Sequence, residues 1–118
     1  MSSVIWFSRH EPTEAQLRDM QEWNGGAIEI VSLSKLASID ILDEEDLEDV
    51  TTRLEMATGY HQAIAIYGVF PTPVQAYLAR SSSSVSKTPC YAAWNVKRSK
   101  EGGPATFEHK AFCIVGWI

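Results

Sequence analysis

Short runs of consecutive apolar residues recur along the first two-thirds of the chain, and each is followed by a polar break. Val4-Ile5-Trp6-Phe7 is the first run and 63–67 is another, whereas the segment 27–31 is apolar except for Glu29. Uninterrupted apolar runs of four or five residues are typical of strands that are buried on both faces. The two uninterrupted runs therefore predict buried strands, and the segment 27–31 predicts a further strand between them in the sequence.

Amphipathic segments separate these runs and predict two helices. Thr13 and Gln16 have the spacing of a capping box at a helix start, and Asn24-Gly25-Gly26 is expected to end that helix. Asp43 is expected to cap a second helix that ends near Gly59. The apolar positions of this second helix recur at helical spacing: Leu47, Val50, Leu54 and Ala57. Its acidic residues are then expected on the solvated face.

The segments around these helices carry weaker signals. Residues 32–42 are mixed and are expected to form a loop, and Ser81–Ser84 is expected to be a loose exit from a third helix. That third helix is predicted to begin with Thr72 as its cap and Pro73 in the first helical position, where a missing N–H costs nothing.

Two β-like runs, 89–98 and 106–118, flank Glu101-Gly102-Gly103-Pro104, which is a hairpin turn signal. The expected register places Lys97 opposite Glu108, Asn95 opposite Lys110, and Trp94 and Val96 against Ala111 and His109. In this register charged positions meet polar or charged ones and apolar positions meet mostly apolar ones, so the pattern is self-consistent.

The complete order is β-α-β-α-β-α-β-β. Strands that alternate with helices imply a mostly parallel sheet with helices on both faces, to which the last hairpin adds an antiparallel strand. A chain of 118 residues, 45% of them hydrophobic, has room for one domain and one core. The sequence therefore predicts a single small Rossmann-like α/β domain over residues 1–118.

Charge limits the partners of this domain. The net charge is −5, but eight acidic residues lie between Asp40 and Glu55 against the single base Arg53, and the remainder is slightly basic. A long nucleic acid wrapped around the molecule is not expected, whereas a small anionic ligand could be held on the remainder. The acidic helix is expected to be a solvated face; the alternatives are a surface for a protein partner and a device against non-specific RNA binding.

Several classes of site and location are not supported. No apolar run approaches the roughly 20 residues that cross a bilayer, and Met1-Ser2-Ser3 leads into the first strand without a basic leader, so a cytoplasmic protein is expected. Cys90 and Cys113 are too few for a disulfide framework or a four-ligand zinc site. No metal is expected, because the chain has no metal-ligand spacing such as His-Glu-x-x-His. No dinucleotide cofactor is expected without Gly-x-Gly-x-x-Gly, and the lack of a Walker loop and of a nucleophile elbow gives no support for phosphate-loop or nucleophilic catalysis.

Open α/β sheets bind ligands beyond the carboxyl ends of their strands. Three segments are expected there: Ser8-Arg9-His10, residues 68–72, and Trp94-Asn95 at the end of the fourth strand. The first two lead into helix N-termini, whose free N–H groups favour an anion. A phosphate-sized cradle is therefore predicted where the loops after the first and third strands open side by side.

The residue types in these segments suit a phosphorylated ligand. Arg9 can pair with a phosphate through two hydrogen bonds, and His10 can transfer a proton near neutral pH. Neutral hydrogen bonds are expected from Thr13, Thr72 and Asn95, and a base platform from Phe70 or Trp94.

Each assignment has a structural alternative. Ser8-Arg9-His10 could be a solvated loop, Gly68 could permit a positive φ, and Phe70 and Trp94 could belong to the core. His109 is expected to be packed within the hairpin.

The order of these segments resembles a known family. Phe7-Ser8-Arg9-His10 followed by residues 12–16 resembles the first strand and helix of small CRISPR-associated ancillary proteins of type III systems, the CARF-like ring nucleases. The resemblance continues at 66–70, 89–93, 96–98, the glycine turn and 107–112. It covers both ends and the middle of the chain, whereas residues 32–60 add nothing to it.

The resemblance implies a CARF-like protomer in a homodimer, with cyclic oligoadenylate bound across the two-fold axis. It further implies metal-independent linearisation, in which a ribose 2′-hydroxyl attacks the adjacent phosphate and type III CRISPR signalling is switched off. Ser8, Arg9 and His10 match the family's turn, although its histidine often follows the serine directly, whereas Arg9 lies between them here.

The expected roles follow from that match. Arg9 would clamp phosphate, His10 would act as acid or base, and Ser8, Thr13 and Thr72 would orient the ligand, most simply cyclic tetra-adenylate. Gly68 and Phe70 would line the pocket. Two alternatives remain open: a non-catalytic sensor with the same pocket, and an interaction module that uses the acidic residues 43–49.

Overall fold

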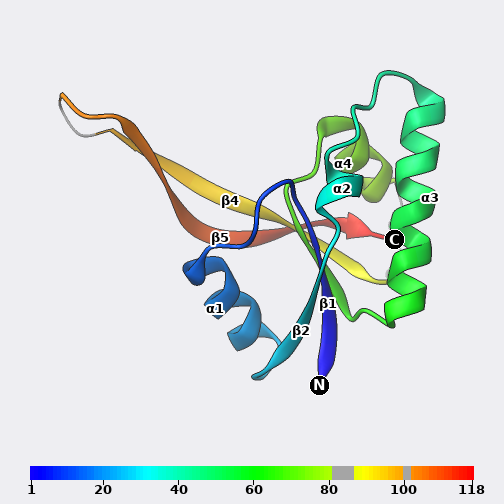
Figure 1. Ribbon diagram of the computed structural model, residues 1–118, viewed down its shortest axis with the longest axis horizontal. Helices are drawn as coiled ribbons and strands as arrows, with labels where there is room; N and C mark the ends of the chain where they lie inside the picture. Colours follow the sequence, from blue (N-terminus) through cyan, green and yellow to red (C-terminus); the bar gives the residue numbers. More distant parts are fainter. Residues whose placement is uncertain (81–86, 100–101) are drawn as a thin grey trace.

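The computed structural model describes residues 1–80, 87–99 and 102–118. The elements follow one another in the order shown in Figure 1: β1 (Ser2–Phe7), α1 (Glu14–Trp23), β2 (Ile28–Ser32), α2 (Ser34–Ala37), α3 (Glu44–His61), β3 (Ala65–Gly68), α4 (Thr72–Ala79), β4 (Pro89–Ser99) and β5 (Ala105–Trp117).

The strands form one sheet in the order β2-β1-β3-β4-β5. The first four strands are parallel, and β5 pairs with β4 in the antiparallel sense. The predicted α/β class, with a mostly parallel sheet and a C-terminal antiparallel hairpin, is confirmed.

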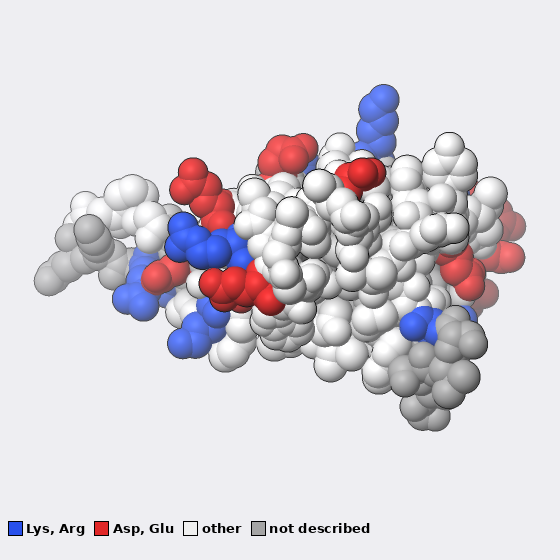
Figure 2. All heavy atoms as spheres, turned by 90° about the horizontal axis from the view of Figure 1, so that it is seen from below, with Lys and Arg blue, Asp and Glu red and all other residues white. Residues whose placement is uncertain are grey.

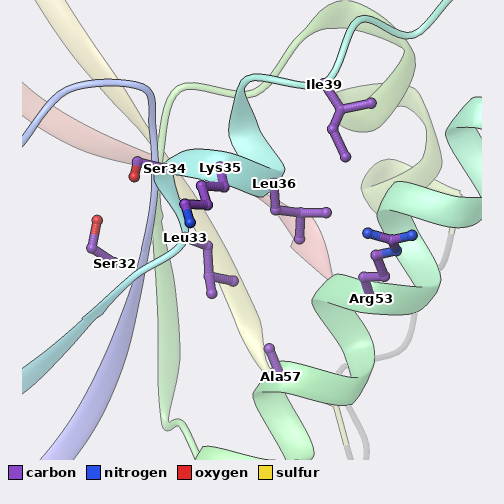
Figure 3. Close-up of a pocket in the computed structure, with 8 residues that line it drawn as sticks. All are labelled: Ser32, Leu33, Ser34, Lys35, Leu36, Ile39, Arg53 and Ala57. Carbon is purple, nitrogen blue, oxygen red and sulfur yellow. The ribbon is translucent and has the colours of Figure 1, made fainter.

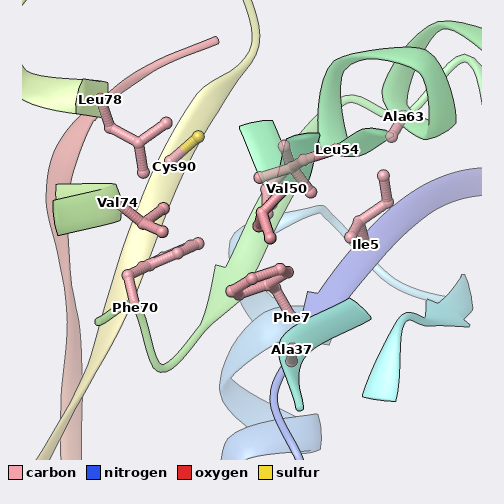
Figure 4. Packing of buried hydrophobic residues seen from close by; sticks show 11 residues of the cluster. Ile5, Phe7, Ala37, Val50, Leu54, Ala63, Phe70, Val74, Leu78 and Cys90 are labelled. Atoms are coloured by element: carbon pink, nitrogen blue, oxygen red, sulfur yellow. The ribbon is translucent and has the colours of Figure 1, made fainter. Parts of the chain in front are cut away.

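Helices cover both faces of the sheet because β1 and β3 are apolar on both. Val4 and Trp6 face one way and pack with Met20 of α1, whereas Ile5 and Phe7 face α2, α3 and α4. Figure 4 shows the second of these layers, where side chains of β1, α3 and α4 meet. Each fully buried side chain of this size contributes about 1.5–3 kcal/mol to the stability of the fold.

Two of the three predicted helix starts are confirmed. The Thr13 hydroxyl accepts a hydrogen bond from the Gln16 backbone N–H, and the Gln16 side chain accepts one from the Thr13 N–H, which completes the capping box. Asp43 caps α3 by accepting from the Asp46 N–H at 2.8 Å. α3 continues two residues past Gly59 and ends where Gln62 takes a left-handed conformation.

The start of α4 differs from the prediction by one residue. The Gln75 N–H closes the first turn on the carbonyl of Pro71, so Pro71 and not Thr72 is the cap. Pro73 therefore occupies the second helical position, where its missing N–H is equally harmless. The exit predicted at Ser81–Ser84 lies outside the described residues.

Residues 32–42 were expected to form a loop, but they contain the short helix α2. A single turn has no repeat for a periodicity argument to detect. Tertiary packing stabilises it: Ala37 is buried in the core, and Leu33 and Leu36 pack against the same cluster.

Of the four pairs predicted in the hairpin, only Trp94 with Ala111 is confirmed, and Val96 pairs with Glu108 instead of His109. Trp94 lies opposite Ala111 as predicted, but a bulge follows, and beyond it Asn95 pairs with His109 and Lys97 with Phe107. Alternation alone does not reveal a bulge, because the extra residue shifts the register without changing residue types. Glu101 of the predicted turn lies outside the described residues.

The hairpin extends far beyond the rest of the sheet. β3 pairs with β4 only over Cys90–Ala92, so residues 93–99 and 105–112 form a two-stranded ribbon, here called the hairpin arm. Figure 1 shows this arm projecting from the body. Trp94 lies on this arm and is 52% exposed, so the core position considered for it from the sequence is wrong.

Candidate functional site

A hollow of about 310 Å³ opens at the carboxyl ends of β1 and β3. We call it the β1–β3 hollow. Its lining is Ser8, Arg9, His10, Ala37, Val69, Phe70 and Pro71. The prediction that the loops after these two strands open side by side at one edge of the sheet is confirmed.

Topology creates this hollow. After β1 the chain passes through α1 to β2 on one side of the sheet. After β3, which lies on the other side of β1, it passes through α4 to β4 in the opposite direction, so a space opens between the two loops. Such a switch point is the usual ligand position of an open α/β sheet. The backbone on both sides is tied together, since the Val69 N–H donates to the Phe7 carbonyl at 2.9 Å.

Gly68 permits a close approach rather than an unusual backbone angle. Its φ is not positive, which removes the alternative raised from the sequence. A Cβ at this position would instead overlap the carbonyl group of Phe7 on the neighbouring strand. Gly68 does not itself line the hollow, as was predicted, but it sets the separation of the two strands that carry the hollow.

Ser8 and Trp6 hold the turn that presents His10. Ser8 is buried, and its hydroxyl accepts a hydrogen bond from the His10 N–H at 3.3 Å. The indole N–H of Trp6 donates to the His10 carbonyl. Both hydrogen bonds use the backbone of His10, so its exposed imidazole remains available at the mouth of the hollow.

Arg9 makes one weak ion pair. One of its terminal nitrogens lies 3.5 Å from Oδ1 of Asp40, and both side chains are well exposed, Arg9 at 60%. An exposed pair of this kind contributes at most about 1 kcal/mol. A ligand phosphate could therefore replace Asp40 as the partner of Arg9 at little cost. Asp40 follows α2, in the segment that the sequence did not connect with the site.

Phe70 forms the floor of the hollow and leaves no open face for a base. It is 4% exposed, and its ring stacks on Phe7 with centroids 5.4 Å apart. The Gln75 side chain donates to the Phe70 carbonyl at 3.0 Å, which ties the loop to α4. The core position was one of the two alternatives considered for Phe70.

The remaining predicted ligand contacts lie elsewhere. Thr13 is the cap of α1, and Thr72 is the exposed first residue of α4; neither lines the hollow. Asn95 lies on the hairpin arm opposite His109, because β4 does not end at this position but continues to Ser99. The hollow thus brings together Ser8, Arg9, His10 and Phe70.

Cys90 is a core residue and not a nucleophile. It is fully buried among the side chains between β4 and α4, and burial raises the pKa of its thiol to about 12. At neutral pH the thiolate is therefore negligible. This agrees with the lack of a motif for nucleophilic catalysis in the sequence.

His109 and Asp19 form a polar pair beneath α1 that the sequence did not predict. Nε2 of His109 lies 2.9 Å from Oδ2 of Asp19, and the His109 side chain is only 6% exposed. The expectation that His109 is packed in the hairpin is confirmed. The Asn24 amide nearby donates to the Tyr67 hydroxyl at 3.1 Å, while burial raises the pKa of Tyr67. The His109–Asp19 pair attaches the hairpin arm to α1, and the Asn24–Tyr67 hydrogen bond attaches the end of α1 to β3.

The described ranges 1–80, 87–99 and 102–118 contain no group of three or more His, Cys, Asp or Glu side chains placed to hold a metal ion. No helix within them is both long and apolar enough to cross a membrane.

The chain matches no protein-family model, and no curated protein or solved structure is significantly similar to it.

Proposed function

We propose that the β1–β3 hollow binds a cyclic oligoadenylate, most simply cyclic tetra-adenylate, and that a homodimer of this chain linearises it without a metal. The single observation that carries the proposal is that Arg9 and His10 lie together at the mouth of a hollow at the carboxyl ends of β1 and β3. Linearisation would end the second-messenger signal of a type III CRISPR system.

The strand order supports a Rossmann-like, CARF-like assignment of the fold. Parallel strands in the order β2-β1-β3-β4 change direction of connection beside β1, as in doubly wound sheets that bind nucleotides. The proposed ligand lies at that point. The N-terminus of α4, which has no side-chain cap, borders the hollow through Pro71 and adds a favourable field for an anion.

The size of the hollow supports the need for a second copy. About 310 Å³ is at the lower end of the range for small-molecule sites, which is roughly 300–1,000 Å³. A ring of four nucleotides exceeds it. Two hollows that face each other across a two-fold axis would double every contact and match the symmetry of the ring.

The proposed reaction needs alignment and charge stabilisation. The ribose 2′-oxygen attacks the adjacent phosphorus, the bond from phosphorus to the 5′-oxygen breaks, and the products are a 2′,3′-cyclic phosphate and a 5′-hydroxyl. Arg9 would leave Asp40 and hold the phosphoryl oxygens, which carry the developing charge. His10 would protonate the departing 5′-oxygen or accept the proton of the 2′-hydroxyl.

The test is incubation with cyclic tetra-adenylate in EDTA, with the products separated by chromatography. We expect the wild type to form ends with a 2′,3′-cyclic phosphate. His10→Ala should lower the rate by about 100-fold or more while binding changes little, and Arg9→Ala should weaken binding about 10-fold. The matched controls are His61→Ala at the end of α3 and Arg18→Ala on the exposed side of α1, which should behave as the wild type.

The result also decides between the alternatives. Tight binding in calorimetry with an intact ring at stoichiometric protein would support the non-catalytic sensor. Absence of both binding and product would refute the proposed function altogether.

A further inference from the structure

A second hollow, of about 490 Å³, lies between α2 and α3. We call it the α2–α3 hollow. It opens beside the carboxyl end of β2 and is therefore at the same edge of the sheet as the β1–β3 hollow. The short helix α2 separates the two, since Ala37 lines the β1–β3 hollow whereas residues 33–36 line the α2–α3 hollow.

The floor of the α2–α3 hollow is apolar. Side chains from both helices and the segment after α2 form it: Leu33, Leu36, Ile39 and Ala57. Figure 3 shows the leucines directed toward α3, with Ala57 below them. A floor of this kind can accept the flat face of a ring, because removal of apolar surface from water is favourable.

Two cations stand at opposite ends of this floor in the view of Figure 3, Lys35 on α2 and Arg53 on α3. Nε of Arg53 donates to Oδ1 of Asp49 at 3.0 Å, one helical turn earlier. This bond orients the guanidinium, and its terminal nitrogens have no acceptor in the described part of the chain. Lys35 likewise has no acidic partner among the described residues.

Two hydroxyls accompany Lys35. Ser32 at the end of β2 and Ser34 at the start of α2 line the hollow, and Figure 3 places both on the Lys35 side. Neither hydroxyl makes a hydrogen bond to another of the residues that the structure describes. One end therefore offers an ammonium group and two hydroxyls, which suits a phosphate, whereas the other offers a planar guanidinium.

We infer that the α2–α3 hollow is a second ligand site, for a nucleoside monophosphate. The phosphate would lie against Lys35, Ser32 and Ser34, and the base would lie on the leucines with the Arg53 guanidinium against it. A planar guanidinium can stack on an aromatic ring or donate hydrogen bonds to it. A fatty-acid chain has no ring for such contacts, so the guanidinium favours a nucleobase as the ligand. The volume lies within the usual range for such ligands. This inference does not depend on the function proposed for the β1–β3 hollow.

The test uses adenosine 5′-monophosphate as the probe, titrated into the isotopically labelled full chain and followed by amide NMR shifts. We expect saturable shifts at residues 32–36 and around Arg53. Lys35→Ala should weaken binding about 10-fold, the effect of losing one charge-assisted hydrogen bond to phosphate. Arg53→Ala should weaken binding of both the monophosphate and plain adenosine, whereas Lys35→Ala should affect only the monophosphate.

Controls separate the two hollows. Lys110→Ala on the hairpin arm and Arg9→Ala in the β1–β3 hollow should leave binding of the monophosphate unchanged. Lys35→Ala should conversely leave cleavage of cyclic tetra-adenylate unchanged. The inference fails if no saturable shift occurs up to millimolar probe, or if the shifts centre on Ser8–His10 and are lost in Arg9→Ala.

Discussion

At the scale of single residues, the β1–β3 hollow depends on side chains whose roles differ in kind. Ser8 is buried and holds the turn, whereas Arg9 and His10 are exposed and free to meet a ligand. Gly68 contributes by the absence of a side chain, because the backbone of Phe7 fills the space where a Cβ would lie. The geometry at the mouth of the hollow therefore depends on one close approach between β1 and β3.

Gly68→Ala is expected to lower the free energy of unfolding by about 3 kcal/mol, because the new methyl group must push the backbones of two central strands apart. Urea denaturation measures this change. The matched control is Gly59→Ala: nothing lies within 4 Å of a Cβ there, and alanine favours the helix, so a gain of up to about 1 kcal/mol is expected. Equal effects at the two positions would contradict the role assigned to Gly68.

At the scale of elements, the hairpin arm is the part whose placement needs an explanation. A two-stranded ribbon is only marginally stable alone in water. Here α1 supports its base: His109 on β5 contacts Asp19 on α1, and its ring lies 4.8 Å from that of Phe112. The bulge after Trp94 pairs His109 of β5 with Asn95 of β4, and β5 is the strand that contacts α1 here. An ion pair between Arg98 and Glu108 adds a contact farther along the arm.

Asp19→Ala is expected to destabilise the protein by about 1–3 kcal/mol, because it leaves the buried Nε2 of His109 without a partner. Denaturation curves give the total effect, and hydrogen exchange should show faster exchange in the hairpin arm than in β1 and β3. Asp49→Ala is the control. It removes an exposed pair with Arg53 and should cost no more than about 0.5 kcal/mol. Unchanged exchange in the arm of Asp19→Ala would show that the pair does not anchor it.

At the scale of the whole molecule, charge and shape are both uneven. The extents are 46 × 37 × 27 Å, and the hairpin arm accounts for the elongation. In Figure 2, acidic side chains gather at the end where Figure 1 places α3, while basic and acidic side chains are mixed near the arm. Both hollows contain cations, so an anionic ligand is favoured locally although the net charge is −5.

If a ring ligand spans two β1–β3 hollows, cyclic tetra-adenylate is expected to shift the chain toward a dimer, because a ligand that binds only the assembled state stabilises it. Light scattering should then give the mass of two chains with one ring bound per pair. Arg9→Ala should require about 10-fold more ligand for the same shift. Saturation of a monomer with one ring per chain would rule out a shared site.

The local sequence determined four features of this protein. They are the order of the strands and main helices, the apolar character of β1 and β3 on both faces, the caps at Thr13 and Asp43, and the position of the β1–β3 hollow. Each depends on residues a few positions apart or on the general rule that loops meet at the carboxyl edge of a parallel sheet. Tertiary structure alone decided the rest. The helix α2, the bulge after Trp94, the approach of Asp40 to Arg9 and the pairing of Asp19 with His109 each depend on contacts between distant segments, whose energies leave no periodic pattern in the chain.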